Sequence, residues 1–112
     1  MDIEFYLPKK ISANSIYSGV HWTKRGKQVK LFRDVNFVAP PPVKEYPVKC
    51  HYHFELKGRK LDISNCFYMV KLIEDCLVRK GVLIDDTQKY VSEITVTASK
   101  GNDVCKINIE GC

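Results

Sequence analysis

The chain has 112 residues, 45% of them hydrophobic and 28% charged, and a formal net charge of +5. This length fits one domain, residues 1–112, that buries a core without disulfides or a structural metal. The composition excludes a disordered or low-complexity chain, and no apolar run has the form of a membrane span or a secretory signal. We therefore expect a cytoplasmic protein, and the positive charge favours an anionic partner.

The first third of the chain is predicted to hold a strand, a loop and a helix. Residues 3–7 favour an opening strand, and residues 9–19 mix Ser, Asn, Gly and Lys in the manner of a loop. From residue 21 to about residue 39, apolar side chains recur with helical spacing and no proline intervenes. We expect this helix to begin near Thr23 or later. Three prolines from Pro40 onward stop it, because proline lacks the amide donor.

The remaining two thirds contain three predicted strands and a longer helix. Residues 46–56 alternate between apolar and polar side chains, which is typical of a half-buried strand. Residues 64–79 have helical spacing, and Gly81 is well placed to end that helix. Two further strands are expected at 90–98 and 104–109. The order β-α-β-α-β-β predicts a single small α+β domain in which two main helices pack on a mixed sheet.

Cysteine usage favours a structural role for these residues. The cysteines are Cys50, Cys66, Cys76, Cys105 and Cys112. Their odd number leaves one unpaired, and none forms a Cys-x-x-Cys pair of the kind that binds zinc or performs redox chemistry. We expect reduced thiols that mostly fill the core.

Charge is unevenly distributed along the sequence. Basic residues crowd the first third: Lys9, Lys10, Lys24, Arg25, Lys27, Lys30 and Arg33. Acidic residues gather in the middle: Asp62, Glu74, Asp75, Asp85 and Asp86. A basic arm beside an acidic centre suits a metal-dependent enzyme that acts on phosphate esters. The alternative is a solvated surface on which like charges cluster by accident.

The predicted helix at residues 64–79 carries two kinds of side chain. A step of about 100° per residue places Lys71 and Asp75 as neighbours on one stripe. The opposite flank, which we expect to face the sheet, carries Cys66, Val70, Ile73 and Leu77. Chain reversal at Gly81 can bring the pair Asp85-Asp86 back beside the helix. The stripe and the returning pair would then form one acidic site.

Three carboxylates close together suit Mg²⁺, a hard cation that prefers oxygen ligands and keeps several waters. A lysine beside them can stabilise charge that develops on a phosphate, or help to orient and deprotonate the attacking water. From spacing alone, the alternative is that Lys71 and Asp75 form an ordinary surface ion pair and that Asp85-Asp86 is a simple turn.

The same stretch resembles the signature of RusA-like Holliday junction resolvases. The matching segments are Asp62-Ile-Ser-Asn65, Lys71-Leu-Ile-Glu-Asp75-Cys-Leu77 and Gly81-Val-Leu-Ile-Asp85-Asp86-Thr-Gln. The family pattern is Asp-x-Asp-Asn, a lysine, Asp-x-Leu four residues on, a glycine, and Asp-Asp before the next strand. Near the start, Leu7-Pro8, Asn14-Ser-Ile-Tyr17 and His21-Trp22-Thr-Lys24-Arg25 resemble the first strand and DNA-facing loop of the family. The resemblance thus covers most of the chain.

The resemblance implies a Mg²⁺-dependent endodeoxyribonuclease, in which Mn²⁺ can substitute, that cuts four-way or other branched DNA in recombination and repair. Asp62 and Asp86 match family metal ligands, Lys71 matches the lysine needed for cleavage, and Asp75 matches a further acidic position counted with the metal ligands. The family also implies a homodimer and a bacterial, phage or prophage source. Two departures stand out: Ser64 replaces the second aspartate, and about three extra residues, nearly one helical turn, precede Lys71.

The basic arm is predicted to contact DNA phosphates through Lys9, Lys10, Lys24, Arg25, Lys27 and Lys30. Trp22 and Tyr17 are candidates for stacking on an unpaired base, with packing beneath the loop an equal alternative for Trp22. His51 and His53 share a strand face and are expected to be solvent-facing residues, since no third metal ligand lies near them in sequence.

Two other functions stay open at this stage. One is a nucleic-acid-binding module without catalysis, for which Ser64 is the best argument. The other is a metal-dependent ribonuclease, which would share the acidic site and differ only in substrate.

Overall fold

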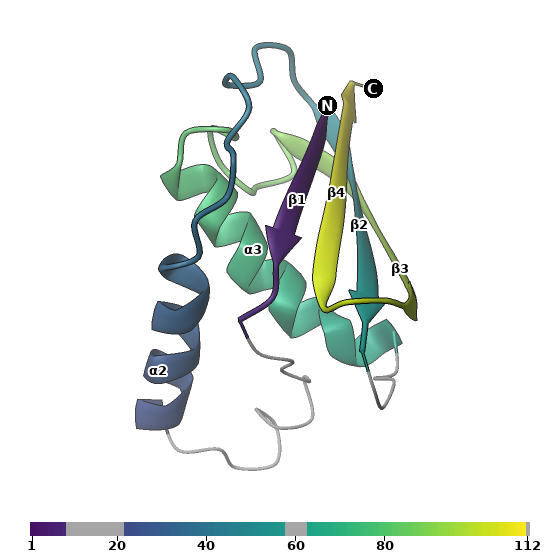
Figure 1. Cartoon of the computed structure of the whole chain (residues 1–112). Coiled ribbons are helices and arrows are strands. Elements are labelled where there is room, and N and C mark those ends of the chain that lie inside the picture. Colours follow the sequence, from purple (N-terminus) through teal and green to yellow (C-terminus); the bar gives the residue numbers. More distant parts are fainter. Residues whose placement is uncertain (9–21, 58–62, 112) are drawn as a thin grey trace.

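Four strands form one mixed sheet in the order β1-β4-β2-β3 (Figure 1). The computed structural model describes residues 1–8, 22–57 and 63–111, apart from the side chains of residues 22–25, 28, 64 and 65. The strands are β1 (Asp2–Tyr6), β2 (Val48–Leu56), β3 (Val91–Lys100) and β4 (Val104–Gly111). The helices are α2 (Trp22–Arg33) and α3 (Phe67–Arg79), with a 3₁₀ turn, η1 (Ile63–Cys66), before α3. The predicted α+β class and order of elements are confirmed.

Strand β4 lies between β1 and β2 and pairs with both of them antiparallel. Strand β3 pairs with β2 in parallel, so that His51 lies opposite Thr95. A parallel pair requires a crossover connection between its strands. Helix α3 lies between β2 and β3 in the sequence and provides that connection. The acidic residues that follow α3 therefore return to the sheet at the start of β3.

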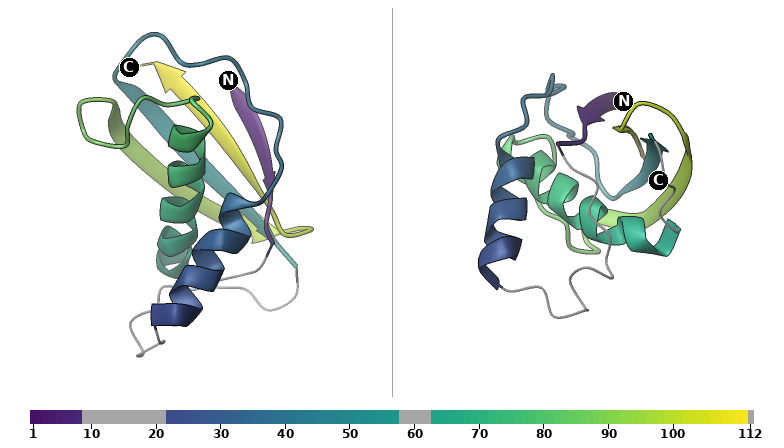
Figure 2. Two further views of the ribbon diagram at one scale, coloured as in Figure 1. Left: turned by 90° about the vertical axis from the view of Figure 1, so that its left-hand side faces the viewer. Right: turned by 60° about the horizontal axis from the view of Figure 1, so that its bottom comes forward.

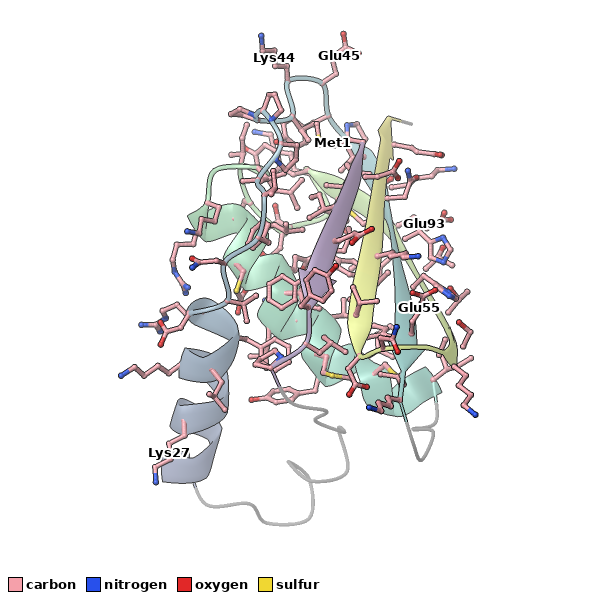
Figure 3. The ribbon with its side chains drawn as sticks, in the orientation of Figure 1. Met1, Lys27, Lys44, Glu45, Glu55 and Glu93 are labelled. Carbon is pink, nitrogen blue, oxygen red and sulfur yellow. The ribbon has the colours of Figure 1, made fainter. Side chains whose placement is uncertain are left out.

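The two faces of the sheet differ because side chains alternate along each strand. On β2 the inner face is buried and consists of Val48, Cys50, Tyr52, Phe54 and Leu56. The other side chains of β2 face outward, as its predicted alternation requires. Both helices lie on the same face of the sheet, and no described helix covers the opposite face, which we call the uncovered face (Figure 2). Glu55 and Glu93 project on that uncovered side (Figure 3).

Helix α3 covers the sheet with the flank that its periodicity predicts. Val70, Ile73 and Leu77 of α3 are buried in the core, together with Cys66 at the end of the preceding turn η1. Burial of each large aliphatic side chain stabilises the fold by about 1.5–3 kcal/mol. Gly81 follows the helix with a φ of 78°, the left-handed conformation that a glycine adopts most easily. The predicted end of this helix is therefore confirmed.

Helix α2 packs beside α3 and is shorter than its periodicity predicts. It ends at Arg33, and residues 35–40 have no regular structure. Asp and Asn, here Asp34 and Asn36, are residue types that favour helix ends over helix interiors, and the residue before Pro40 is disfavoured in a helix. Phe32 is fully buried, and its carbonyl oxygen accepts a hydrogen bond of 3.4 Å from Cys76 Sγ. This bond joins the end of α2 to the middle of α3.

The four cysteines that the structure describes, Cys50, Cys66, Cys76 and Cys105, are buried free thiols. This confirms their predicted structural role, and Cys112 lies outside the described residues. Burial raises the pKa of the Cys50 thiol to about 12. Such a thiol stays protonated and unreactive near neutral pH. In the described part of the chain, no helix is long and apolar enough to cross a membrane.

An aromatic cluster joins β1 to the segment that follows α2. Phe5 is fully buried, and its ring centroid lies 5.9 Å from that of Phe32 and 5.5 Å from that of Phe37. Phe5→Ala is therefore expected to lower the free energy of unfolding by about 3–5 kcal/mol, measured by urea denaturation. The neighbouring Tyr6 is 60% exposed, so Tyr6→Ala is the matched control and should change stability by less than about 1 kcal/mol. Equal losses in both variants would contradict this packing.

Candidate active site

Lys71 and Asp75 lie on the exposed stripe of α3, away from the sheet. Lys71 Nζ is 3.4 Å from Asp75 Oδ1, one helical turn further along. The side chains are 59% and 47% exposed, so this contact alone contributes only a few tenths of a kcal/mol. The predicted placement of this pair is confirmed. The pair gains a third member because a later segment of the chain places Asp86 beside Lys71.

The segment after Gly81 returns Asp86 to Lys71. Lys71 Nζ donates a hydrogen bond of 2.6 Å to Asp86 Oδ2, which lies 15 positions further along the chain. Asp85 instead turns toward the backbone, because its Oδ1 accepts a hydrogen bond of 2.8 Å from the Asp86 amide. The expected return of the acidic pair is confirmed. Of the two residues, Asp86 is the one that faces the helix.

Three contacts hold the segment that carries Asp86 against the rest of the fold. Val82 donates its amide proton to the Leu77 carbonyl oxygen at 2.9 Å, which folds the segment back onto α3. The Val82 carbonyl oxygen accepts a bond of 2.9 Å from Val43. The Ile84 amide donates to Tyr46 Oη at 3.1 Å. The position of Asp86 thus depends on residues 43–46 as well as on the helix, a dependence that the sequence pattern did not indicate.

The Lys71–Asp86 contact shifts the pKa of both partners. The hydrogen bond to Asp86 raises the pKa of Lys71, and the nearby charges of Asp75 and Asp86 add to that effect. The same bond holds the pKa of Asp86 below its ordinary value. Lys71 is therefore an ammonium and Asp86 a carboxylate at neutral pH. A fixed positive charge thus lies between two fixed negative charges on an open surface.

Glu74 is a buried carboxyl group directly beneath this surface, and the sequence pattern did not place it there. It is the one charged residue among the described residues that is buried, with 5% of its surface exposed. Burial raises its pKa to about 7, and the negative charge of Asp86 adds to the shift. The helical spacing could have predicted its burial, because Glu74 lies four residues after Val70 and three before Leu77, on the edge of the buried flank.

Glu74 lies near Tyr52 of strand β2. Burial and the charge of Glu74 raise the pKa of Tyr52 well above its ordinary value. Within the described residues, however, neither Tyr52 Oη nor Glu74 Oε2 has a hydrogen-bond partner of normal geometry. An unpaired carboxyl oxygen in the core is destabilising by about 1–3 kcal/mol, and more when it is ionised. Glu74 is consequently most stable in its protonated form.

The oxygen atoms around Lys71 are of the kind that Mg²⁺ binds. Within residues 1–8, 22–57 and 63–111, no group of three or more His, Cys, Asp or Glu side chains is arranged to hold a metal ion. Lys71 uses one oxygen each of Asp75 and Asp86, so each carboxylate retains a second oxygen. Mg²⁺ is commonly held by one or two carboxylates together with waters and phosphate oxygens. Asp62, the other predicted ligand, lies outside the described residues.

The predicted DNA-binding residues are described only in part. Lys27 and Lys30 are exposed on α2, and Figure 3 shows Lys27 on the lower part of that helix, at the opposite end of the molecule from Lys44. Lys9, Lys10 and Tyr17 lie outside the described residues, as do the side chains of Trp22, Lys24 and Arg25. Helix α2 has no acidic residue in its first turn, and its last turn carries the basic residues Lys30 and Arg33.

His51 and His53 face the uncovered side of the sheet. His51 Nε2 and His53 Nδ1 each lie 2.6 Å from Thr97 Oγ1 on the neighbouring strand. The hydroxyl donates one proton and accepts one hydrogen bond, so it can pair with two neutral imidazole rings in complementary tautomers. Their predicted outward orientation is confirmed, and His51 Nε2 and both ring nitrogens of His53 form hydrogen bonds to the neighbouring strand.

Comparison with known proteins identified no relative of this chain. No protein-family model matches the sequence, and no curated protein shows a significant match.

The raised pKa of Glu74 predicts a specific dependence of stability on pH. Between pH 4.5, the ordinary pKa of this group, and about pH 7, Glu74 is protonated in the folded protein and ionised in the unfolded chain. The unfolded chain thus binds fewer protons, so the free energy of unfolding falls as pH rises through this window. Glu74→Gln stays neutral. Urea denaturation should find this variant more stable than wild type above pH 7 by up to about 3 kcal/mol, with little difference near pH 4.5.

Glu110→Gln is the matched control, because Glu110 is exposed on β4. Its stability profile should run parallel to that of the wild type throughout. A constant difference between Glu74→Gln and wild type from pH 4.5 to pH 8 would contradict the burial of an ionisable Glu74.

Proposed function

We propose that this chain is a Mg²⁺-dependent endodeoxyribonuclease that hydrolyses phosphodiester bonds at four-way or other branched DNA junctions. The observation that carries the proposal is the 2.6 Å contact between Lys71 and Asp86. A protonated lysine, the carboxylate of Asp75 and the carboxylate of Asp86 meet on an exposed surface, at the positions that match the RusA-like signature. These two residue types, lysine and aspartate, serve phosphodiester hydrolysis because they supply a fixed positive charge and metal ligands.

Each residue has a distinct proposed role. Asp75 and Asp86 would hold Mg²⁺ through the oxygens that Lys71 does not use, with Asp62 as the further family-matched ligand. When bound, Mg²⁺ supplies a Lewis acid and a water of lowered pKa. The hydrogen bond to Asp86 raises the pKa of Lys71. As an ammonium, Lys71 would stabilise the negative charge that develops on the phosphate and help to orient the attacking water, and removal of the water's proton would fall to another base.

The basic residues would hold the DNA backbone beside this centre. Lys27 and Lys30 are exposed on α2, which packs against α3, the helix that carries Lys71. Phosphate contacts of this kind are independent of base sequence and suit recognition of branch shape. A homodimer is part of the proposal, because two symmetric nicks on a twofold junction require a twofold enzyme.

A second candidate function is binding of branched nucleic acid without cleavage. The observation in its favour is Ser64, which stands where the family pattern has its second aspartate. Loss of one carboxylate can weaken metal binding enough to abolish chemistry and leave phosphate binding intact. A ribonuclease with the same residues is distinguished by its substrate.

Cleavage of a labelled four-way DNA junction tests the proposal. Wild type is expected to make paired nicks with Mg²⁺ and none with EDTA, and to leave linear duplex and RNA hairpins uncut. Lys71→Ala should reduce the nicking rate at least about 100-fold, because a preorganised charge at the phosphate is lost. Lys89→Ala is the control and should nick at the wild-type rate. Lys89 is exposed, lies over the Tyr90 ring and, within the described part of the chain, forms no ion pair with Asp75 or Asp86.

The outcomes separate the candidate functions. Tight binding to the junction without nicks under Mg²⁺ or Mn²⁺ would contradict the nuclease and favour the binder. Faster digestion of RNA hairpins than of DNA junctions would make the protein a ribonuclease.

Salt dependence of binding tests the role of α2. The double variant Lys27→Ala, Lys30→Ala should weaken junction binding and reduce the slope of log K against log salt by about one for each lost phosphate contact. Fluorescence anisotropy across a salt series measures this slope. Lys44→Ala, at the other end of the molecule (Figure 3), should leave it unchanged. An unaltered slope in the double variant would place the DNA elsewhere on the protein.

A further inference from the structure

Strand β1 forms one edge of the described sheet, and its hydrogen-bond pattern identifies which of its backbone groups point away from β4. Met1 and Ile109 exchange both backbone bonds, with Ile109 N to Met1 O at 2.9 Å and Met1 N to Ile109 O at 3.2 Å. Leu7 N bonds Asp103 O at 2.9 Å in the same register. In an antiparallel pair such residues alternate with ones that point outward. Hence Asp2, Glu4 and Tyr6 direct their N–H and C=O groups to the free edge.

A groove of about 490 Å³ runs along this free edge. Strand β1 forms one wall, and Phe37, Val38 and Pro40 contribute to the other. The second wall is anchored because the Phe37 ring packs on Phe5 at 5.5 Å. Figure 1 shows this segment running beside β1 on the side away from β4. The volume is within the usual range of ligand clefts, and its polar lining includes the backbone of a strand.

The side chains around the groove differ between its two sides. On the outer face of the sheet lie the carboxylates of Asp2 and Glu4, in a chain whose net charge is +5. Both are held in place, since Asn108 Nδ2 donates to Asp2 Oδ1 at 2.7 Å and Tyr6 Oη donates to Glu4 Oε2 at 3.2 Å. On the inner side the wall is mainly apolar, with Asn36 as its one polar residue among those described, and Val38 is 91% exposed. An added strand would therefore meet carboxylates on one face and apolar surface on the other.

These features disfavour a second copy of β1 as the occupant. Two β1 strands paired antiparallel about Glu4 would place Glu4 opposite its own symmetry mate. Like charges directly opposite each other destabilise a pair of strands. A strand with lysine or arginine at alternate positions would instead form favourable cross-strand pairs, and its intervening apolar side chains would face Phe37 and Val38.

We infer that the groove beside β1 binds an extended peptide segment in which basic residues alternate with apolar residues, as a fifth strand of the sheet. Backbone bonds to the outward groups of Asp2, Glu4 and Tyr6 supply affinity, and the alternating side chains supply specificity. This surface is separate from Lys71 and Asp86. The inference is independent of the proposed nuclease activity.

Amide hydrogen exchange of the ¹⁵N-labelled full chain tests this inference. The probe is an acetylated, amidated seven-residue peptide in which lysine alternates with valine, and the control peptide has the same composition with its lysines adjacent. The alternating peptide should slow exchange of the Glu4 and Tyr6 amides at least about tenfold, since these amides have no backbone partner among the residues that the structure describes. The control peptide should give little protection.

Two variants keep the test decisive. Glu4→Pro removes an outward N–H, which leaves the β4 ladder intact, and should weaken peptide binding at least about tenfold. Glu4→Lys keeps the outward backbone N–H and reverses the charge of the side chain. This variant should no longer bind the lysine–valine peptide and should bind a glutamate–valine peptide of the same pattern. Glu110→Lys, on the outer side of β4 away from the groove, is the control for charge and should bind the lysine peptide as wild type does.

Several results would overturn the inference. Unchanged exchange of the Glu4 and Tyr6 amides at saturating peptide would do so, as would equal binding by Glu4→Lys and wild type. Protection of these amides by self-association of the free protein would identify a second copy as the occupant. Protection of the same amides by a DNA junction, with displacement of the peptide, would identify nucleic acid.

Discussion

The structure depends on burial of one flank of α3 against one face of the sheet. Cys66, Val70, Ile73 and Leu77 fill the space over the inner face, and the opposite stripe is consequently directed to solvent. Each of these residues is worth about 1–3 kcal/mol of burial, whereas the exposed Lys71–Asp75 pair contributes a few tenths. Hydrophobic packing therefore sets the orientation of the helix, and the polar site is positioned as a result of it.

The same constraint explains Glu74 and the exposed polar contacts. Glu74 lies at the border of the buried flank, so α3 cannot pack without taking a carboxyl group out of water. The segment after Gly81 then places Asp86 at 2.6 Å from Lys71. Because both helices use one face of the sheet, the other face is left to polar side chains, and β1 is an edge strand of the described sheet. The proposed catalytic surface and the proposed peptide groove are thus separate consequences of one packing arrangement.

Much of the fold follows from sequence periodicity, and the exceptions have physical reasons. The alternation of β2 and the buried flank of α3 were predictable because each repeats over several turns or residues. The early end of α2 at Arg33 was not, because its apolar spacing continues past Asp34 and Asn36, two residue types that favour helix ends. Of the site, the neighbours Lys71 and Asp75 follow from helical geometry, and the return of Asp86 was expected from the chain reversal. The choice of Asp86 over Asp85 rested on family resemblance, and the support from Tyr46 depends on tertiary contacts.

The proposed Mg²⁺ site is shared by Asp75 and Asp86 beside Lys71. The most direct test is titration of Mn²⁺ into ¹⁵N-labelled protein, because bound Mn²⁺ broadens the NMR signals of nearby amides. We expect the amides of Asp75 and Asp86 to broaden first, excess Mg²⁺ to reverse the effect, and Asp86→Asn to weaken it at least about tenfold. Broadening that begins on the uncovered face of the sheet, near Glu93 or Glu110, would contradict the central claim.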